Sequence, residues 1–249
     1  MARLSILTGS SHKAFLRYLR GLFIGDSGQG YGSNFVDPNS AVTEWKDCLF
    51  FLSYPPSDRD YTKWPPSLRD DVELVGGQIL ALARQLLAIL SENLGLPASA
   101  IEDAMEVLHQ KLLVAHYPAC PQPDLAMGTC EHTDFGIITC LWQASEDVVA
   151  LQVCKDGQWH SVEPYPGALV VNVGDQIEIF SNGLYKSGPH RVVLNSLKSR
   201  LSVVAFHNPP AAAIVSPAEA LIDKDHPPKY NPTLFMDYPK KLMFSASLS

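Results

Sequence analysis

Residues 132–143 read His-Thr-Asp-Phe-Gly-Ile-Ile-Thr-Cys-Leu-Trp-Gln, a histidine and an aspartate followed by an apolar run. The run over residues 136–143 is rich in β-branched and apolar side chains, which predicts a buried strand. In an extended segment, residues two apart point to the same side, so His132 and Asp134 can face one ion together. This stretch therefore predicts β-structure with two candidate metal ligands ahead of it.

A third candidate ligand, His190, begins a second β-like run over residues 190–194. Two histidines and one carboxylate on one side of a metal, with the other positions open, form the facial triad of non-haem Fe(II) oxygenases. Each piece alone has an ordinary explanation, because an isolated His-x-Asp is often a surface feature and a distant histidine is often a packed one. Their order, each beside an apolar run, favours a metal site formed by His132, Asp134 and His190.

Arg200 and Ser202 are also two apart, in a strand-like run over residues 200–207. A guanidinium fork beside a hydroxyl group suits the far carboxylate of a small dicarboxylic acid. The alternative is simple alternation in a strand, with the arginine on a solvated face. Together with the three candidate ligands, the pair favours an acid-binding site near a redox metal.

Composition sets broad limits on this 249-residue chain. Hydrophobic residues make up 46% and charged residues 18%, which is typical of a globular protein with one sizeable core. The net charge of −7 and the lack of a basic cluster argue against a nucleic-acid partner, and we expect no membrane span. Five cysteines without CxxC spacing favour reduced thiols, so a cytoplasmic protein is expected. The first 25 residues lack Asp and Glu, so an organelle-targeting segment is the alternative.

The first half of the chain predicts two helices. Apolar residues recur at helical spacing over residues 68–94, with Ser67 as a candidate cap. Residues 99–102 form a capping-box pattern before a second short helix that should end near His109. Residues 45–54 are aromatic and apolar, which predicts a strand or a buried connector.

From residue 111 onward, short β-like runs alternate with turns. Strands are expected over residues 112–117, 136–143, 150–154, 159–162, 168–173, 176–180, 190–194 and 201–207. Asp156-Gly157 and Asn182-Gly183 are typical of tight hairpins. Many short strands at this spacing indicate a sandwich or barrel, so we expect a mainly β fold with N-terminal helices and a double-sheet jelly roll.

Several motifs occur together between residues 30 and 208. They are Tyr-Pro-Ala-Cys-Pro-Gln-Pro at 117–123, His-Thr-Asp at 132–134, Gly-Gln-Trp at 157–159, Asn-Val-Gly-Asp at 172–175, Ser-Asn-Gly at 181–183, Tyr-Lys-Ser at 185–187 and His-Arg-Val at 190–192. In these motifs the chain resembles the plant-type 2-oxoglutarate- and Fe(II)-dependent dioxygenases, such as anthocyanidin synthase, flavonol synthase and aminocyclopropane-carboxylate oxidase. The resemblance implies a distorted double-stranded β-helix, or jelly roll.

Site roles also follow from this resemblance. His132, Asp134 and His190 match the iron ligands, and the pair Arg200 and Ser202 matches the residues that bind the distal carboxylate of 2-oxoglutarate. The implied activity couples oxidative decarboxylation of 2-oxoglutarate to hydroxylation or desaturation of a small secondary-metabolite or hormone-like substrate. Fe(II), 2-oxoglutarate and O2 are the implied cofactors and cosubstrates, with ascorbate as the reductant.

Two aromatic residues match family positions near the bound small molecules. Tyr117 matches a tyrosine that can reach 2-oxoglutarate, and Phe206 matches an aromatic residue that often packs against substrate. Either could instead be a core residue. Trp159 and the segment 172–175 are expected to serve only turns and packing.

Other functions remain open at this point. An aminocyclopropane-carboxylate-oxidase-like enzyme would keep the same residues but use ascorbate in place of 2-oxoglutarate. An inert, truncated homologue is also possible, because the 29 residues before the Gly-Tyr-Gly turn do not resemble the longer segment of relatives. Two further departures are Ala115, where relatives often carry Asn, and Pro189, which could shift His190.

The organisation expected from these patterns has four parts. Residues 1–29 are a divergent lead-in, the remnant of a missing N-terminal region, and residues 30–110 are a helical front region. Residues 111–210 form the jelly-roll domain with the iron and 2-oxoglutarate site, and residues 211–249 form a C-terminal tail. We expect a monomer that binds a small-molecule substrate.

Overall fold

The computed structural model describes residues 28–33 and 43–238. Within these ranges the fold is mainly β, as expected. Four groups of paired strands and three α-helices are present in the described part. The expected lead-in over residues 1–29 falls almost wholly outside the described residues, as does the end of the C-terminal tail.

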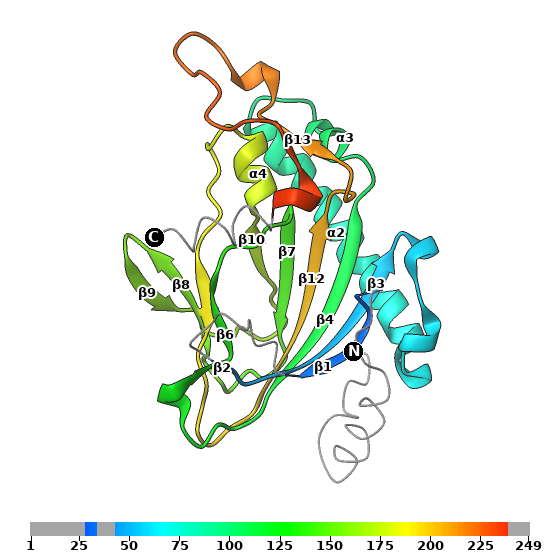
Figure 1. Cartoon of the computed structure of the whole chain (residues 1–249), viewed down its shortest axis with the longest axis vertical. Helices are drawn as coiled ribbons and strands as arrows, with labels where there is room; N and C mark the ends of the chain where they lie inside the picture. The colour runs from blue at the N-terminus through cyan, green and yellow to red at the C-terminus, as the bar shows by residue number, and fades with distance from the viewer. Residues whose placement is uncertain (1–27, 34–42, 239–249) are drawn as a thin grey trace.

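The largest element is a six-stranded sheet that curves through the middle of the molecule (Figure 1). Its strands, in spatial order, are β1 (Gly30–Ser33), β3 (Asp47–Tyr54), β4 (His109–Tyr117), β12 (Arg200–Asn208), β7 (Ile138–Gln143) and β10 (Val170–Val173). All neighbours in this sheet are antiparallel. Because β1 and β3 belong to it, the region 30–110 is not simply helical but supplies two strands of the main sheet.

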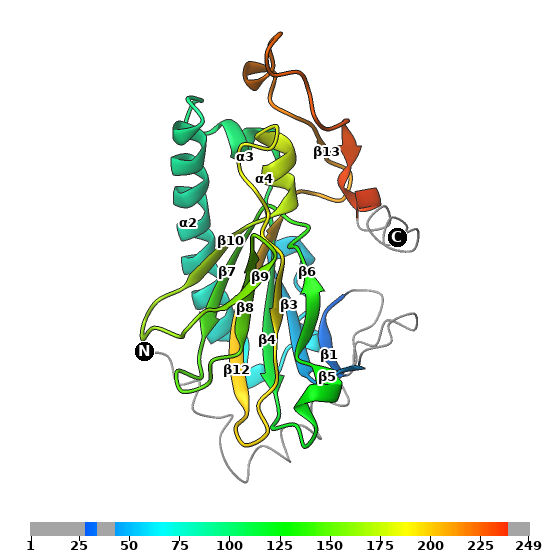
Figure 2. The ribbon, with the colours of Figure 1, turned by 90° about the vertical axis from the view of Figure 1, so that its left-hand side faces the viewer.

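A four-stranded sheet lies against one side of the large one (Figure 2). It contains β6 (Thr129–His132), β11 (His190–Val192), β8 (Leu151–Lys155) and β9 (Gln158–Ser161). Asp156 and Gly157 both have positive φ in the turn between β8 and β9, as a type I′ hairpin requires. Two small pairs complete the β-structure: β2 (Thr43–Glu44) with β5 (Ala126–Met127), and β13 (Ile214–Val215) with β14 (Thr233–Leu234).

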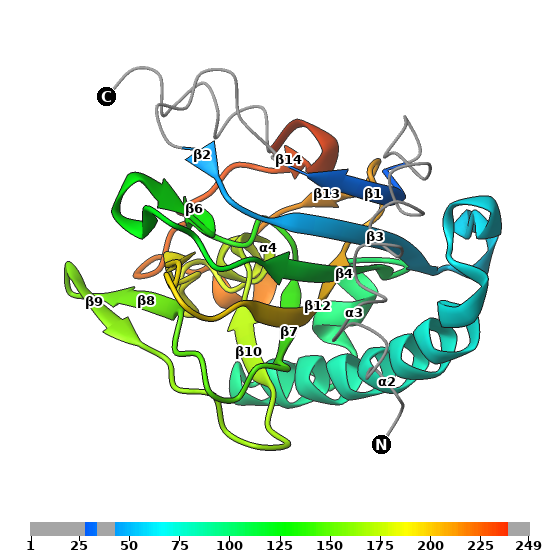
Figure 3. The same ribbon diagram turned by 90° about the horizontal axis from the view of Figure 1, so that it is seen from below.

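The long helix α2 (Arg69–Asn93) covers the opposite side of the large sheet (Figure 3). Its buried residues include Val72 and Ile79, which pack with Leu49, Phe51, Leu112, Cys140 and Ala205 of the sheet. Together with the 3-10 turn before it, this helix is long and apolar enough to span a membrane by length and composition alone, although no membrane span was expected from the sequence. Its packing against the sheet is that of a core helix.

Two faces of the large sheet therefore have different partners. A second apolar cluster joins the large sheet to the small one. It contains Leu151 and Val192 of the small sheet and Cys48, Ala115, Tyr117, Leu141 and Val204 of the large sheet. Since side chains alternate along a strand, every second residue of β3, β4 and β12 points toward the small sheet. We call this side of the large sheet the inner face.

Several local predictions about helices are wrong. The expected strand over residues 176–180 is the helix α4 (Asp175–Phe180), because its alternating Ile177 and Ile179 both pack into a core formed with α2 and α3 (Ala100–Ala104). Asn182 and Gly183 follow this helix and close no hairpin. The Gly183 N–H donates to the Glu178 carbonyl, and Asn182 and Gly183 both have positive φ. Neither Ser67 nor Ser99 makes a side-chain cap, and the second helix ends at Ala104, before β4.

Short 3-10 helices fill the connections. They are η2 (Pro56–Asp58), η3 (Tyr61–Lys63), η4 (Pro66–Leu68), η5 (Pro123–Leu125), η6 (Glu219–Leu221) and η7 (Phe235–Asp237). The turn η4 leads directly into α2 and leaves Leu68 as its N-cap residue, which explains why Ser67 does not cap the helix. The described C-terminal segment lies over one end of the sheets, beside α4 (Figure 1).

Candidate metal centre

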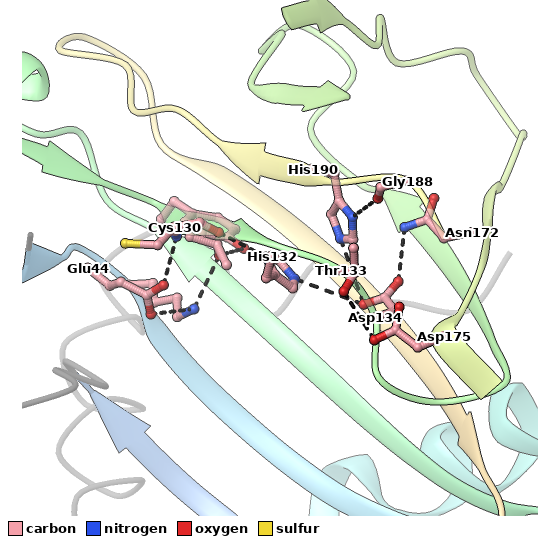
Figure 4. A network of polar contacts seen from close by, with 12 residues as sticks. Glu44, Cys130, His132, Thr133, Asp134, Asn172, Asp175, Gly188 and His190 are labelled. Atoms are coloured by element: carbon pink, nitrogen blue, oxygen red, sulfur yellow. Dashed lines mark hydrogen bonds and ion pairs between the residues drawn. The ribbon is translucent and has the colours of Figure 1, made fainter. Parts of the chain in front are cut away.

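The structure brings His132, Asp134 and His190 together. Their potential ligand atoms all lie within 4.8 Å of one another. The Nε2 atoms of His132 and His190 lie 3.9 Å and 3.7 Å from Oδ1 of Asp134. The three side chains converge on one point (Figure 4), so the order and spacing seen in the sequence do correspond to one cluster in space.

Strand pairing explains how the two histidines meet. His132 is the last residue of β6, His190 is the first residue of β11, and the two residues are direct antiparallel partners. Side chains of such partners lie on the same face, and the two imidazole centroids are 4.2 Å apart. Pro189 does not disturb this arrangement, since its carbonyl accepts a 2.8 Å hydrogen bond from Cys154 of β8.

Backbone carbonyls orient both imidazoles. Nδ1 of His132 lies 2.8 Å from the Cys130 carbonyl, and Nδ1 of His190 lies 3.1 Å from the Gly188 carbonyl. A carbonyl oxygen can only accept, so each Nδ1 carries the proton and each Nε2 offers a lone pair toward Asp134. Burial and the neighbouring His190 lower the pKa of His132, which favours the neutral form that a metal requires.

Asp134 lies beyond the end of β6, contrary to the expectation of one continuous strand edge. The turn at residues 134–137 is held by the start of α4. The N–H groups of Asp175 and Gln176 donate to the carbonyls of Asp134 and Gly136, at 2.8 Å and 3.0 Å. A Cβ on Gly174 would collide with the Gly136 carbonyl, so this close approach requires glycine there.

Two polar side chains support this turn, and sequence reasoning assigned them no chemical role. Asn172 of β10 donates from Nδ2 to Oδ2 of Asp134 at 3.1 Å, and Thr133 donates to the buried Asp175 at 3.1 Å (Figure 4). The Asn172 bond leaves Oδ1 of Asp134 facing both histidines. Only the pairing of β10 with β7 places Asn172 there, so its role was not visible in local sequence.

The donor set fits a divalent transition metal. The side chain of Asp134 is 4% exposed, and no Lys or Arg among residues 28–33 and 43–238 forms an ion pair with it. A buried carboxylate without a cation is costly unless another positive charge meets it. Two imidazole nitrogens and one carboxylate oxygen on one side match the facial arrangement of non-haem iron sites.

Arg200 and Ser202 lie on the inner face of β12, both buried. Arg200 donates to Gln143 at 3.2 Å and lies 3.4 Å from the Ser202 hydroxyl, while its Nε is buried without a partner. Burial lowers the pKa of this guanidinium, and no carboxylate in the described ranges pairs with it. A buried fork with an unused N–H is suited to an acidic ligand.

The two aromatic candidates also lie on the inner face. Tyr117 is the direct strand partner of Arg200, whose guanidinium carbon lies 5.2 Å from the tyrosine ring centroid. Its hydroxyl contacts Thr129 at 3.3 Å. Phe206 lies further along β12, paired with Lys111 and Thr139. Both aromatics pack in the cluster between the sheets, so the core interpretation and the binding interpretation are compatible.

Comparison with known proteins agrees with this geometry. Residues 108–209 match the family described as the 2OG-Fe(II) oxygenase superfamily. The chain belongs to this family. It is 38% identical over 215 residues to Jasmonate-induced oxygenase 2 of Arabidopsis thaliana, covering 84% of this chain and 58% of that protein. It is 40% identical over 208 residues to Naringenin,2-oxoglutarate 3-dioxygenase of Callistephus chinensis, covering 82% and 58%.

Among solved structures, the chain is similar to that of JOX2 in complex with 2OG, Fe and JA. The TM-score is 0.81 at 38% identity, over 86% of this chain and 64% of that one. The chain thus spans less than two thirds of the length of these relatives. What the relatives bind and do is therefore a guide to a proposal for this chain.

Proposed function

We propose that this protein is a non-haem Fe(II) dioxygenase that couples oxidative decarboxylation of 2-oxoglutarate to hydroxylation or desaturation of a small substrate. The observation that carries the proposal is the convergence of two oriented Nε2 atoms and one buried carboxylate oxygen. The buried, carboxylate-free guanidinium of Arg200, on the inner face of the large sheet, supports it independently. Substrates of the secondary-metabolite or hormone class agree with the names of the relatives.

In this proposal, His132, Asp134 and His190 hold Fe(II). Bound iron and 2-oxoglutarate, with O2, would supply the oxidising chemistry, and ascorbate would keep the iron reduced. The chain itself sets the tautomer of both imidazoles through the carbonyls of Cys130 and Gly188. Asn172 keeps Oδ1 of Asp134 turned toward the histidines. These contacts fix the ligands before the metal arrives.

Arg200, Ser202 and Tyr117 would bind 2-oxoglutarate. Arg200 has an unused buried Nε–H, and Ser202 lies beside it as a further donor. A guanidinium fork binds a carboxylate through two parallel hydrogen bonds, which orients the acid as well as holding it. Ala115 lies next to Ser202 across the strand pair and offers no polar group there.

The two sheets would form the distorted double-stranded β-helix of the family, with residues 111–210 carrying the iron and cosubstrate residues. Family membership and the antiparallel pairing of both sheets support this. Phe206, on the inner face beyond Ser202, would contact the substrate.

The test is an anaerobic titration of the purified chain with Fe(II) and 2-oxoglutarate, followed by visible absorption. A weak metal-to-ligand charge-transfer band should appear, and it should be lost in Asp134→Ala while circular dichroism is unchanged. Aerobic succinate formation should show the same dependence. If the folded wild-type chain gives no band, or if Asp134→Ala still forms succinate, the proposal is wrong. Ascorbate-dependent turnover without 2-oxoglutarate would instead indicate the oxidase-like alternative.

A further inference from the structure

A network of polar side chains extends from β2 toward the candidate metal centre. Its central residue is Lys46, which lies between β2 and β3. Nζ of Lys46 forms a 2.8 Å ion pair with Glu44 and donates to the Thr129 hydroxyl at 3.2 Å. Glu44 also accepts from the Cys130 N–H at 2.8 Å, and Cys130 lies between Glu44 and His132 (Figure 4). The proposed function gives Lys46 no role.

Main-chain pairing fixes Lys46 beside β6. The strand β2 runs parallel to β5, and the Trp45 N–H donates to the Met127 carbonyl at 2.8 Å, two residues before Thr129. The side chains of Lys46 and Glu44 are only 11% and 14% exposed. Taking two charges out of water costs about as much free energy as their attraction returns, so such a pair contributes little net stability. The position of Lys46 therefore calls for an explanation other than stability.

A bulge in β6 turns Thr129 toward the same side as the metal ligand His132. His190 of β11 pairs with His132, and Val192 pairs with Thr129, so two steps along β11 match three along β6. Partners in an antiparallel pair share a face, and Val192 belongs to the apolar cluster between the two sheets. Thr129 therefore points between the sheets as well, and its hydroxyl lies 3.3 Å from the Tyr117 hydroxyl.

Close packing holds the Tyr117 ring against this part of the chain. A Cβ on Gly128 would lie 2.9 Å from Cδ1 of Tyr117, which is too close for two carbon atoms. Glycine at this position therefore allows the ring to approach the backbone beside Thr129. Tyr117 is also the strand partner of Arg200, whose guanidinium carbon lies 5.2 Å from the ring centroid. Tyr117 thus links Thr129 to the arginine that is proposed to bind 2-oxoglutarate.

The chemistry of the donors sets the direction of these hydrogen bonds. An ammonium group can only donate, so the Thr129 oxygen accepts from Lys46. This bond polarises the Thr129 hydroxyl, which favours donation of its own hydrogen to the Tyr117 oxygen. Arg200 is also purely a donor and offers Tyr117 no acceptor. Because no acceptor besides Thr129 contacts the Tyr117 hydroxyl within residues 28–33 and 43–238, its hydrogen is left to donate to a bound carboxylate.

We propose that Lys46 is a positioning residue for 2-oxoglutarate. Acting through Thr129, it directs the Tyr117 hydroxyl to donate to the distal carboxylate that Arg200 binds. Without Lys46, Tyr117 can donate to Thr129 instead, and the acid must then compete for this hydrogen. The inference rests on the proposed function, because it requires a 2-oxoglutarate molecule at Arg200.

The test is an anaerobic titration of the charge-transfer band with 2-oxoglutarate at saturating Fe(II). Lys46→Met should raise the half-saturating concentration about fivefold, which corresponds to one neutral hydrogen bond. Thr129→Val removes the competing acceptor, so both Thr129→Val and Lys46→Met/Thr129→Val should stay within about twofold of wild type. In a Tyr117→Phe background, Lys46→Met should have no further effect.

A direct attraction between Lys46 and 2-oxoglutarate would give a different pattern. The loss in Lys46→Met would then persist undiminished in the Thr129→Val and Tyr117→Phe backgrounds, and this result would overturn the proposal. Unchanged affinity in Lys46→Met would overturn it as well. A structural defect in Lys46→Met would not be rescued by a second substitution at Thr129.

Two further variants control for the charge that Lys46→Met leaves behind. Lys46→Met/Glu44→Gln removes both members of the ion pair and keeps a side-chain oxygen for the Cys130 N–H, so it should show the same loss as Lys46→Met. Glu44→Gln alone should bind 2-oxoglutarate as wild type does. If Glu44→Gln alone reproduces the loss, the effect comes from the structure around Cys130 and the proposal is wrong. Lys155→Met, at an exposed position of the β8–β9 hairpin, should change nothing.

The same band separates this inference from the proposed function. If the band is absent from folded wild-type protein, the proposed function itself fails. If wild-type protein and Lys46→Met both show the band at the same 2-oxoglutarate concentration, only the role of Lys46 is wrong. The Fe(II) concentration for half-saturation, measured at saturating 2-oxoglutarate, should be equal in all of these variants, because the three metal ligands are unchanged.

Discussion

Nδ2 of Asn172 lies 3.1 Å from Oδ2 of Asp134, which joins β10 to the turn that carries the carboxylate of the candidate metal centre. Asp134 is outside any strand, so its direction depends on such contacts. The other carboxylate oxygen, Oδ1, faces both histidines. Asn172 is therefore a positioning residue for the proposed iron ligand.

Asn172→Ala should weaken Fe(II) binding about 10- to 100-fold, the range found when a hydrogen-bond partner of a metal ligand is removed. The measurement is the Fe(II) dependence of the charge-transfer band at saturating 2-oxoglutarate. Val171→Ala is the matched control, because Val171 is the exposed neighbour of Asn172 on the same strand. Equal metal affinity in the two variants would show that the 3.1 Å contact does not position Asp134.

Arg200→Met should separate binding from stability. The 2-oxoglutarate concentration for half-saturation should rise about 30-fold or more, because a charged, bidentate partner is lost. Without ligand, the variant should unfold at the same or a higher temperature, since a buried guanidinium with an unpartnered Nε is replaced by an apolar side chain of similar length. Titration of the band and thermal unfolding measure the two effects. A large loss of stability in the ligand-free variant would mean that Arg200 is mainly structural.

His207 should make stability depend on pH. It is 1% exposed; its Nδ1 donates to the Ile138 carbonyl at 3.0 Å, and its Nε2 contacts Gln110 at 3.0 Å. Burial lowers its pKa to about 4. The unfolded chain then binds a proton that the folded chain does not, so stability is lost as pH falls from about 6.5 to about 4, by about 3 kcal/mol in total.

Urea unfolding at several pH values in this window, compared with His207→Gln, isolates the contribution. Glutamine can also donate to one partner and accept from the other, but it does not titrate. The variant should lose less stability than wild type between pH 6.5 and pH 4, because all other titrating groups are shared. Parallel stability curves for the two proteins would rule out this role of His207.

Gly174→Ala should destabilise the fold and disturb the metal centre together. The added methyl group would collide with the Gly136 carbonyl in the turn that carries Asp134. Overpacking of this kind costs about 1–3 kcal/mol. Gly77→Ala in α2 is the control, since a Cβ there meets nothing within 4 Å and alanine favours a helix. Denaturant unfolding and Fe(II) titration test the two consequences. A variant with normal stability and normal metal affinity would contradict the close-packing argument.

Much of this protein could be predicted from local sequence. Alternating and apolar runs indicated β4, β7 and β12, and helical spacing indicated α2. The motifs around His132 and His190 indicated the 2OG-Fe(II) oxygenase family, which the comparisons confirm. These features are local, because strand alternation, helix periodicity and turn chemistry each depend on a few neighbouring residues.

Tertiary structure decided the rest. Residues 175–180 alternate like a strand but form α4, because the segment packs on the turn at Asp134 through Gly174. The contacts of Asn172 with Asp134 and of Tyr117 with Thr129 both depend on strand register. Register joins residues far apart in the chain, so local patterns in one sequence do not specify it. Sequence alone determined which residues are available for the chemistry, and packing between distant strands decided which of them meet.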